Sequence, residues 1–164
     1  MKWEPPLPHN ASQSRINPAG IPYLYLAHDI KTAVSEVRPW ISCKITVAKF
    51  TLKKEISVVN FSNKVFVNAP KDEQYEVMEN IWRELITRLF SMPFDPRDDI
   101  AYIPTQYISE RFKKEGFDGI IYDSAVNAAG YNLCLFDVGI AKANKGHKVT
   151  VNSMDIKMNV EDIE

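Results

Sequence analysis

Hydrophobic positions along the chain recur with two different periods, which predicts a mixture of helices and strands. The clearest helix is expected over residues 72–90, where apolar side chains return every three or four positions along one broad stripe. The members of this stripe are Tyr75, Met78, Ile81, Trp82, Leu85, Ile86 and Leu89. We interpret the stripe as core packing rather than as a ligand groove, because an amphipathic helix usually buries such a face.

Two shorter helices are predicted from the residues at their boundaries. One covers Thr105–Glu115, begins after Pro104 and ends at Gly116, which is a favourable residue just past a helix. The other starts after Asp29, a good N-cap, and runs through Val37. The expected inward positions are Ile108 and Phe112 in the longer helix, and Ala33, Val34 and Val37 in the shorter one.

Short apolar runs bounded by turn residues predict strands. They cover Pro22–Ala27, Ser42–Leu52, Ile56–Asn60, Gly119–Tyr122 and Tyr131–Phe136. The apolar phase slips within residues 42–52, so a bulge or a strand buried on both faces is expected there. Apolar residues alternate again from Lys148 to Val160, with a slip at 153–154 that indicates a bulge or a turn between two strands. A polar stretch with Lys142, Lys145, His147 and Lys148 is interpreted as a solvated patch, with contact to phosphate or an acidic partner as the alternative.

Helices and strands do not alternate in a regular βαβ rhythm. The predicted fold class is therefore α+β, with a mixed, mostly antiparallel β-sheet core and two to three helices. A length of 164 residues, 45% of them hydrophobic, fits one globular domain. Residues 1–14 are expected to form an irregular, proline-rich lead-in and residues 15–164 a single catalytic domain, which could be part of a longer protein.

Composition argues against several classes of function. The formal net charge is -1, so non-specific nucleic-acid binding is not favoured. No apolar run is long enough to span a bilayer and no signal peptide is recognised, so a cytoplasmic protein without a membrane partner is expected. Cys43 and Cys134 are interpreted as small buried hydrophobes. The three histidines are scattered, and we expect no metal site.

Polar chemistry is concentrated around the predicted strand over residues 22–27. Arg15 precedes a turn, Tyr23 and Tyr25 lie on the strand, and Glu36 lies on the helix that follows. A turn, strand and helix in this order would bring these side chains close together. Arginine and glutamate are rarely buried unless they are paired or serve a site. The alternative is that Arg15 and Glu36 form a structural ion pair.

Three segments resemble those of the RES-domain family, which is named after an arginine, a glutamate and a serine. The first two are Arg15-x-Asn17-Pro18-x-Gly20-x-x-Tyr23-x-Tyr25 and Thr32-Ala33-x-x-Glu36-x-Arg38-Pro39. The third is Gly116-Phe117-Asp118-Gly119-Ile120-Ile121-Tyr122-x-Ser124, followed by Gly130-x-Asn132 and Phe136. Three segments in the right order are far more specific than one short motif.

The resemblance implies a toxin of a bacterial toxin–antitoxin pair that consumes NAD⁺, with a fold related to ADP-ribosyltransferases. Members of the family cleave the nicotinamide–ribose bond with water or with inorganic phosphate, and some are linked to ADP-ribosyl transfer onto a protein. NAD⁺ would be the substrate and inorganic phosphate a potential co-substrate, with no other cofactor. The implied partner is an antitoxin that covers the active site. A module that binds NAD⁺ without turning it over is the non-enzymatic alternative.

The resemblance also suggests roles for the residues that match. Glu36 would stabilise the positive charge that develops on the ribose carbon, as in glycoside cleavage. Tyr25 would stack on nicotinamide, and it is preferred over Tyr23 because its separation from Glu36 resembles the family's arrangement. Arg15 would grip the pyrophosphate with its planar fork of donors.

Ser124 and Asn132 complete the predicted set. Ser124 would position a ribose or nicotinamide group, and Asn132 would contribute to substrate binding. Ser124 is not assigned as a nucleophile, because no histidine is placed to activate it. The alternatives are that Ser124 only shapes the turn over 123–130 and that Tyr25 is an ordinary core aromatic.

Overall fold

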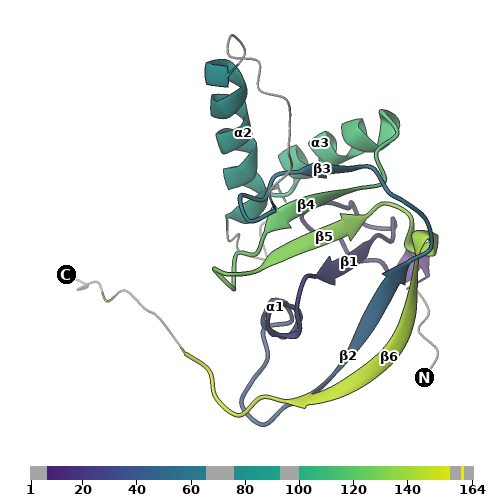
Figure 1. Cartoon of the computed structure of the whole chain (residues 1–164), viewed down its shortest axis with the longest axis vertical. Helices are drawn as coiled ribbons and strands as arrows, with labels where there is room; N and C mark the ends of the chain where they lie inside the picture. Colours follow the sequence, from purple (N-terminus) through teal and green to yellow (C-terminus); the bar gives the residue numbers. More distant parts are fainter. Residues whose placement is uncertain (1–6, 66–75, 93–99, 156–159, 161–164) are drawn as a thin grey trace.

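The computed structural model describes residues 7–65, 76–92, 100–155 and 160, with the backbone alone over 76–82. Its main sheet has four strands in the order β1-β5-β4-β3 (Figure 1). These strands are β1 (Leu24–Ala27), β3 (Val58–Asn60), β4 (Gly119–Asp123) and β5 (Tyr131–Leu135). The β3–β4 pair is parallel and the other pairs are antiparallel. A separate antiparallel ribbon joins β2 (Lys44–Leu52) to β6 (Ala141–Thr150).

Three α-helices and two short 3-10 turns surround the strands within the described residues. They are α1 (Ile30–Glu36), α2 (Glu76–Ser91), α3 (Ile103–Lys114), η1 (Pro8–Asn10) and η2 (Val138–Ile140). Figure 1 shows α2 and α3 on one side of the sheet, where both contact β4, and the ribbon on the other side. The helix α1 contacts both β1 and β2. The predicted α+β class with a mixed, mostly antiparallel sheet is confirmed.

Two apolar clusters bury the two faces of the sheet. The first includes Phe90 of α2, Ile120 of β4 and Cys134 of β5, with Phe112 of α3 packed against it. The second includes Leu135, the neighbour of Cys134, together with residues at the start of the ribbon. Adjacent residues on a strand point to opposite faces, so β5 is buried on both sides. This explains why its sequence is a continuous apolar run rather than an alternating one.

The start of α1 agrees with the sequence, but its buried face does not. The side chain of Asp29 accepts a hydrogen bond from the backbone N–H of Thr32 at 2.6 Å and caps the helix as predicted. Thr32 is fully buried, whereas the expected inward residue Val37 is 61% exposed. The loop between β4 and β5 packs on α1 through Asn127, whose side-chain amide donates to the Thr32 hydroxyl at 2.8 Å. A polar contact therefore sets which face of this short helix is inside.

The two longer helices agree with the sequence over most of the length that the structure describes. The start of the predicted first helix, Tyr75, and the side chains of Met78, Ile81 and Trp82 lie outside the described residues. Ile86 packs against the first cluster, but Leu85 is 49% exposed, so its assignment to the inward stripe is wrong. α3 begins at Ile103, before the predicted start at Thr105, and so includes Pro104 in its first turn. It is followed by Gly116 at φ +90°, as predicted.

The ribbon contains one predicted feature and one that was missed. The register of β2 against β6 shifts between Ala48 and Phe50, where a bulge was expected. The sequence interpretation placed no strand over 141–147, although β6 runs from Ala141 to Thr150. The predicted continuation is wrong for residues 151–155, which are irregular, and 156–159 lie outside the described residues. β6 was missed because its polar and lysine side chains obscure the alternation.

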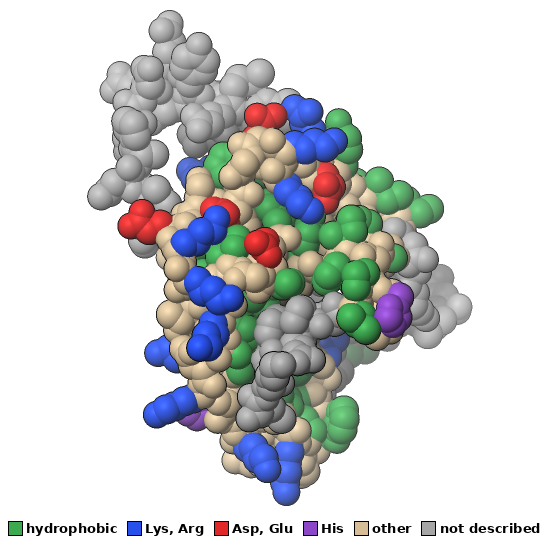
Figure 2. Space-filling model, turned by 90° about the vertical axis from the view of Figure 1, so that its right-hand side faces the viewer, with side chains coloured by type: hydrophobic (Ala, Val, Ile, Leu, Met, Phe, Trp, Pro, Cys, Tyr) green, Lys and Arg blue, Asp and Glu red, His purple; other side chains and the backbone are tan. Residues whose placement is uncertain are grey.

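Exposed lysines are frequent on this ribbon. Those on its two strands are Lys44, Lys49, Lys142, Lys145 and Lys148, and all are exposed. Neither strand contains an aspartate or glutamate. Figure 2 shows lysine and arginine side chains along one edge and the lower end of that face of the molecule. The predicted solvated patch is therefore part of a basic β-ribbon.

Both cysteines are buried and unbridged, as predicted. Among the helices of the described residues, none combines the length and the apolarity needed to cross a bilayer.

Candidate active-site cleft

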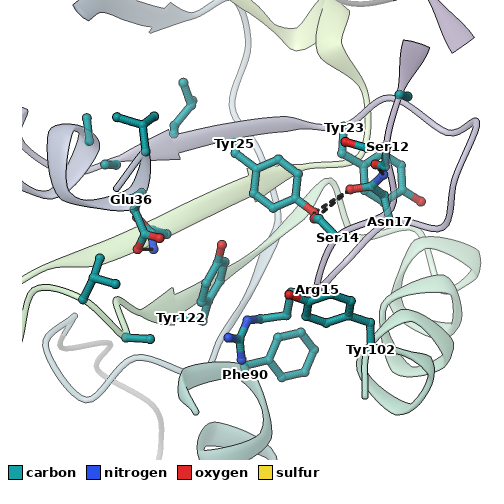
Figure 3. Close-up of a pocket in the computed structure, with 18 of the residues that line it drawn as sticks. Ser12, Ser14, Arg15, Asn17, Tyr23, Tyr25, Glu36, Phe90, Tyr102 and Tyr122 are labelled. Atoms are coloured by element: carbon teal, nitrogen blue, oxygen red, sulfur yellow. Dashed lines mark hydrogen bonds between the residues drawn. The ribbon is translucent and has the colours of Figure 1, made fainter. Parts of the chain in front are cut away.

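A cleft of about 740 Å³ opens beside the β1 edge of the main sheet. Its walls come from the segment 10–17, β1, the end of α1 and the end of α2 (Figure 3). The predicted residues Arg15, Tyr23, Tyr25, Glu36 and Asn132 all line it. The cleft therefore gathers side chains that are more than a hundred positions apart in the sequence.

Glu36 stands at the C-terminal end of α1 and is held by two neutral donors. Its Oε1 accepts hydrogen bonds from Ser124 Oγ at 2.8 Å and from Asn132 Nδ2 at 2.6 Å. Asn132 lies on β5, and Ser124 directly follows β4. Within the described residues no donor contacts Oε2, so this oxygen can accept from a ligand. The structure thus brings together three residues that the sequence predicted as a set.

Ser124 serves the turn and the carboxylate at once. Its hydroxyl oxygen accepts from the backbone N–H of Asn127 at 3.1 Å and of Val126 at 3.3 Å. The same hydroxyl donates a hydrogen bond to Glu36 Oε1. The turn-shaping alternative and the site role are therefore both present. A hydroxyl with these contacts orients the carboxylate and has no base that would make it a nucleophile.

Tyr25 offers its ring to the cleft and its hydroxyl to the protein. The hydroxyl donates to Asn17 Oδ1 at 2.7 Å and lies 2.5 Å from Ser14 Oγ, while the residue as a whole is 39% exposed. Burial around the hydroxyl raises its pKa well above the ordinary value, so it stays protonated. An exposed ring on a fixed hydroxyl is a rigid stacking platform rather than a core aromatic.

Tyr23 lines the cleft but directs its hydroxyl elsewhere. This residue is only 6% exposed, and its hydroxyl donates to Glu110 Oε1 of α3 at 2.6 Å. Lys113 donates to the same hydroxyl at 3.1 Å and lies 4.9 Å from the ring centroid. The structure therefore does not bring the Tyr23 hydroxyl to Glu36. Its polar contacts fasten the β1 region to α3.

Arg15 is anchored by the end of α2. Its Nη1 donates to the Leu89 carbonyl at 2.9 Å and its Nη2 to the Met92 carbonyl at 2.5 Å. Burial lowers the pKa of the guanidinium, while nearby tyrosine hydroxyls and the Glu36 carboxylate act in the opposite direction. The group stays cationic because the arginine pKa is so high. Among the described residues no ion pair joins Arg15 to Glu36, so the structural-pair alternative does not account for this arrangement.

Sequence reasoning missed two further cleft residues of the described chain. Asn17 was named only within the first matching segment and given no role, yet its side chain also holds the Tyr25 hydroxyl. Tyr122 was assigned only to a strand, yet its side chain lines the cleft. A signal for Tyr122 was available, because side chains two positions apart on a strand share a face and Ser124 had already been chosen. The described residues contain no group of three or more His, Cys, Asp or Glu that could hold a metal ion.

A carboxylate, a half-buried cation and an exposed aromatic ring around one cleft are groups that suit a small molecule with both anionic and hydroxyl groups. The family model for the RES domain matches residues 3–156, and the chain therefore belongs to the RES-domain family. At the level of the family this membership supports an NAD-related function associated with toxin–antitoxin systems. A search of curated proteins gives no match.

Proposed function

We propose that this protein is an NAD⁺-degrading enzyme that cleaves the nicotinamide–ribose bond, by hydrolysis or phosphorolysis, as the toxin of a toxin–antitoxin pair. The observation that carries the proposal is the Glu36 carboxylate, oriented by Ser124 and Asn132 in a cleft that also contains a half-buried arginine. Family membership, which supports an NAD-related function at the level of the family, is the second support for the proposal. The fold's relation to ADP-ribosyltransferases stays a prediction.

The chemistry follows from how charge moves when this bond breaks. The electron pair of the bond goes to the pyridinium nitrogen, nicotinamide leaves as a neutral molecule, and positive charge develops on the ribose carbon. Glu36 supplies a fixed negative charge for that carbon, and its Oε2 can accept from ribose hydroxyls. A water that attacks the carbon loses a proton, whereas inorganic phosphate attacks through an oxygen that is already anionic.

The other side chains hold the substrate around that carbon. Arg15, which is anchored by carbonyls at the end of α2, binds pyrophosphate oxygens. The Tyr25 ring stacks on the nicotinamide. Ser124 and Asn132 act through Glu36, since both of their donors reach its Oε1. Tyr23 contributes only the wall of the cleft, because its hydroxyl is bound to α3. No metal or further cofactor takes part in the proposed reaction.

The proposed partner is an antitoxin that closes the cleft. Large apolar side chains at and just after the end of α1 are exposed, namely Val37 at 61%, Trp40 at 74% and Ile41 at 58%. Val37 lines the cleft, so an apolar protein surface that covers these residues would also block the entrance. We propose cytoplasmic action, where NAD⁺ is present, with no direct role for nucleic acid or membrane.

The test is NAD⁺ consumption by the purified protein, with and without inorganic phosphate, with products identified by mass. Nicotinamide and ADP-ribose in both conditions would mean hydrolysis, and release that needs phosphate would mean phosphorolysis. Label retained on a macromolecule would favour a protein ADP-ribosyltransferase instead. Stabilisation of the protein by NAD⁺ without any nicotinamide release would favour a binding module and contradict the proposal.

A further inference from the structure

Tyr122 occupies an unusual position for a tyrosine at the end of a buried strand. Its ring belongs to the first apolar cluster, 6.3 Å from that of Phe90, and the residue is 7% exposed. Nevertheless it lines the cleft. Figure 3 shows its hydroxyl pointing into the space between Glu36 and Tyr25, with the Arg15 side chain on the other side.

The Tyr122 hydroxyl differs from the hydroxyls of Tyr23 and Tyr25 in having no hydrogen-bond partner among the described residues. Tyr23 donates to Glu110 and Tyr25 donates to Asn17. For Tyr122 no hydrogen bond to any described residue is present. Buried tyrosine hydroxyls usually find a partner, because an unsatisfied polar group away from water is unfavourable. An unsatisfied hydroxyl that faces a cleft is therefore available to a ligand.

The surroundings of this hydroxyl keep it a neutral donor. Burial raises the pKa of Tyr122 and the Glu36 carboxylate adds to this rise, whereas Arg15 opposes it. The hydroxyl is consequently protonated at neutral pH and can give its proton to an anionic oxygen. Hydrogen bonds to ionised acceptors are roughly twice as strong as those between neutral groups.

We infer that the Tyr122 hydroxyl is a substrate-binding group that donates to the phosphate next to the nicotinamide ribose. The inference rests on the proposed function, which places the ribose at Glu36 and the pyrophosphate at Arg15. The Tyr122 side chain lies between Glu36 and Arg15 in Figure 3, and the charges of both act on its hydroxyl, so a phosphate that joins the ribose to the Arg15 end of the cleft would pass within its reach. Tyr122 lies directly opposite Asn132 in the β4–β5 register, so one strand pair holds both the Glu36 carboxylate and this phosphate donor.

The substitution Tyr122→Phe tests the inference, because it removes only the hydroxyl and retains the packed ring. We expect kcat/KM for NAD⁺ to fall about 10- to 100-fold, mainly through KM, because the phosphate contact exists before and during bond cleavage. The melting temperature should not fall, because the hydroxyl has no partner in the described structure to lose. The matched control is Tyr107→Phe, since Tyr107 is 69% exposed on α3 and does not line the cleft.

A binding measurement separates this inference from the proposed function. Calorimetric titration with ADP-ribose, which retains the phosphate and ribose in question, should show weaker binding to Tyr122→Phe. Adenosine monophosphate, which lacks that phosphate, should bind both proteins alike. A wild type that cleaves NAD⁺ beside a Tyr122→Phe protein with unchanged KM and ADP-ribose affinity would overturn the role of Tyr122 alone. A folded wild type that neither cleaves NAD⁺ nor binds ADP-ribose would overturn both.

Discussion

The carboxylate of Glu36 is oriented by neutral side chains, and this bears directly on what it can do. A carboxylate paired with a cation has much of its charge compensated before any substrate arrives. The hydroxyl of Ser124 and the amide of Asn132 fix the same group without neutralising it. The full negative charge is then available to a cationic ribose carbon, which is the situation in which electrostatic stabilisation is largest.

This argument predicts the behaviour of Glu36→Gln. The glutamine amide oxygen can accept the two hydrogen bonds that now reach Oε1, so the fold should be retained. The negative charge is lost, and we expect turnover of NAD⁺ to fall by about 100-fold or more. The measurement is kcat together with the melting temperature. Glu115→Gln is the control, because the Glu115 side chain is 62% exposed at the far end of α3. A folded Glu36→Gln protein with a near-normal rate would remove Glu36 from the mechanism.

The sequence predicted which residues belong to the site better than it predicted the contacts that each side chain makes. Arg15, Glu36 and Ser124 could be selected because family resemblance links distant segments. The direction of a hydroxyl depends on irregular backbone, and neither periodicity nor propensity describes that. The Tyr25 hydroxyl is fixed by a turn around Asn17, and the Tyr23 hydroxyl is fixed by α3. For this reason the two tyrosines could not be told apart by sequence pattern alone.

At the scale of elements, the β4–β5 loop and α1 are locked together by three small or polar residues. Asn127 donates to the Thr32 hydroxyl, and a Cβ added at Gly130 would overlap that hydroxyl and crowd the Thr32 methyl group. The same loop carries Ser124 and the same helix carries Glu36. The distance between donor and carboxylate is thus set by the packing of two elements rather than by either alone.

Gly130→Ala should therefore damage both stability and activity. The added methyl group must push α1 away from the loop, which we expect to cost about 1–3 kcal/mol, the usual range for overpacking. The Ser124–Glu36 hydrogen bond would lengthen and NAD⁺ turnover would fall. Denaturant unfolding and kcat give the two readouts. Gly146→Ala is the matched control, since the nearest atom to its added Cβ would be 3.6 Å away. Equal stability of Gly130→Ala and Gly146→Ala would contradict the proposed close packing of the β4–β5 loop on α1.

Asp29, the N-cap of α1, is expected to contribute to stability in a way that depends on pH. Hydrogen bonds from Thr32 lower the pKa of Asp29. A lowered pKa in the folded protein contributes stability above the ordinary Asp value, and this stability is lost as pH falls through the folded value. Asp29→Ala should therefore cost about 0.5–2 kcal/mol at neutral pH and less in acid. Melting curves at both pH values provide the check, with Asp155→Ala as control, because Asp155 is exposed in an irregular segment. A difference in melting temperature between the wild type and Asp29→Ala that increases in acid would contradict this account.

Element boundaries were predictable where a local signal existed and were missed where only tertiary pairing decided. Asp29, Pro104 and Gly116 each mark a helix end through their own backbone chemistry. β6 has no such marker over most of its length. Its strand character comes from pairing with β2 along nearly its full length, which a single segment cannot reveal.

The whole molecule is a sheet enclosed on both faces, by α2 and α3 on one side and by the β-ribbon on the other. Cys134 lies in the middle of this arrangement, fully buried on β5, and burial raises the pKa of its thiol. In a Cys43→Ser background Cys134 is the only thiol. Its modification by a thiol reagent should therefore need opening of the sheet and accelerate steeply with denaturant. Rapid, stoichiometric modification of the native protein would show that the sheet opens locally.

The lysine-rich ribbon affects how charge is distributed over the protein. A formal net charge of -1 combined with five lysines on two strands free of acidic residues requires the balancing negative charge to lie elsewhere on the chain. The protein is therefore nearly neutral overall but carries a basic β-ribbon. It should be retained by a cation-exchange resin in dilute buffer even above its pI of about 6.3. Salt near 0.1 M, where screening acts within about 10 Å, should release it.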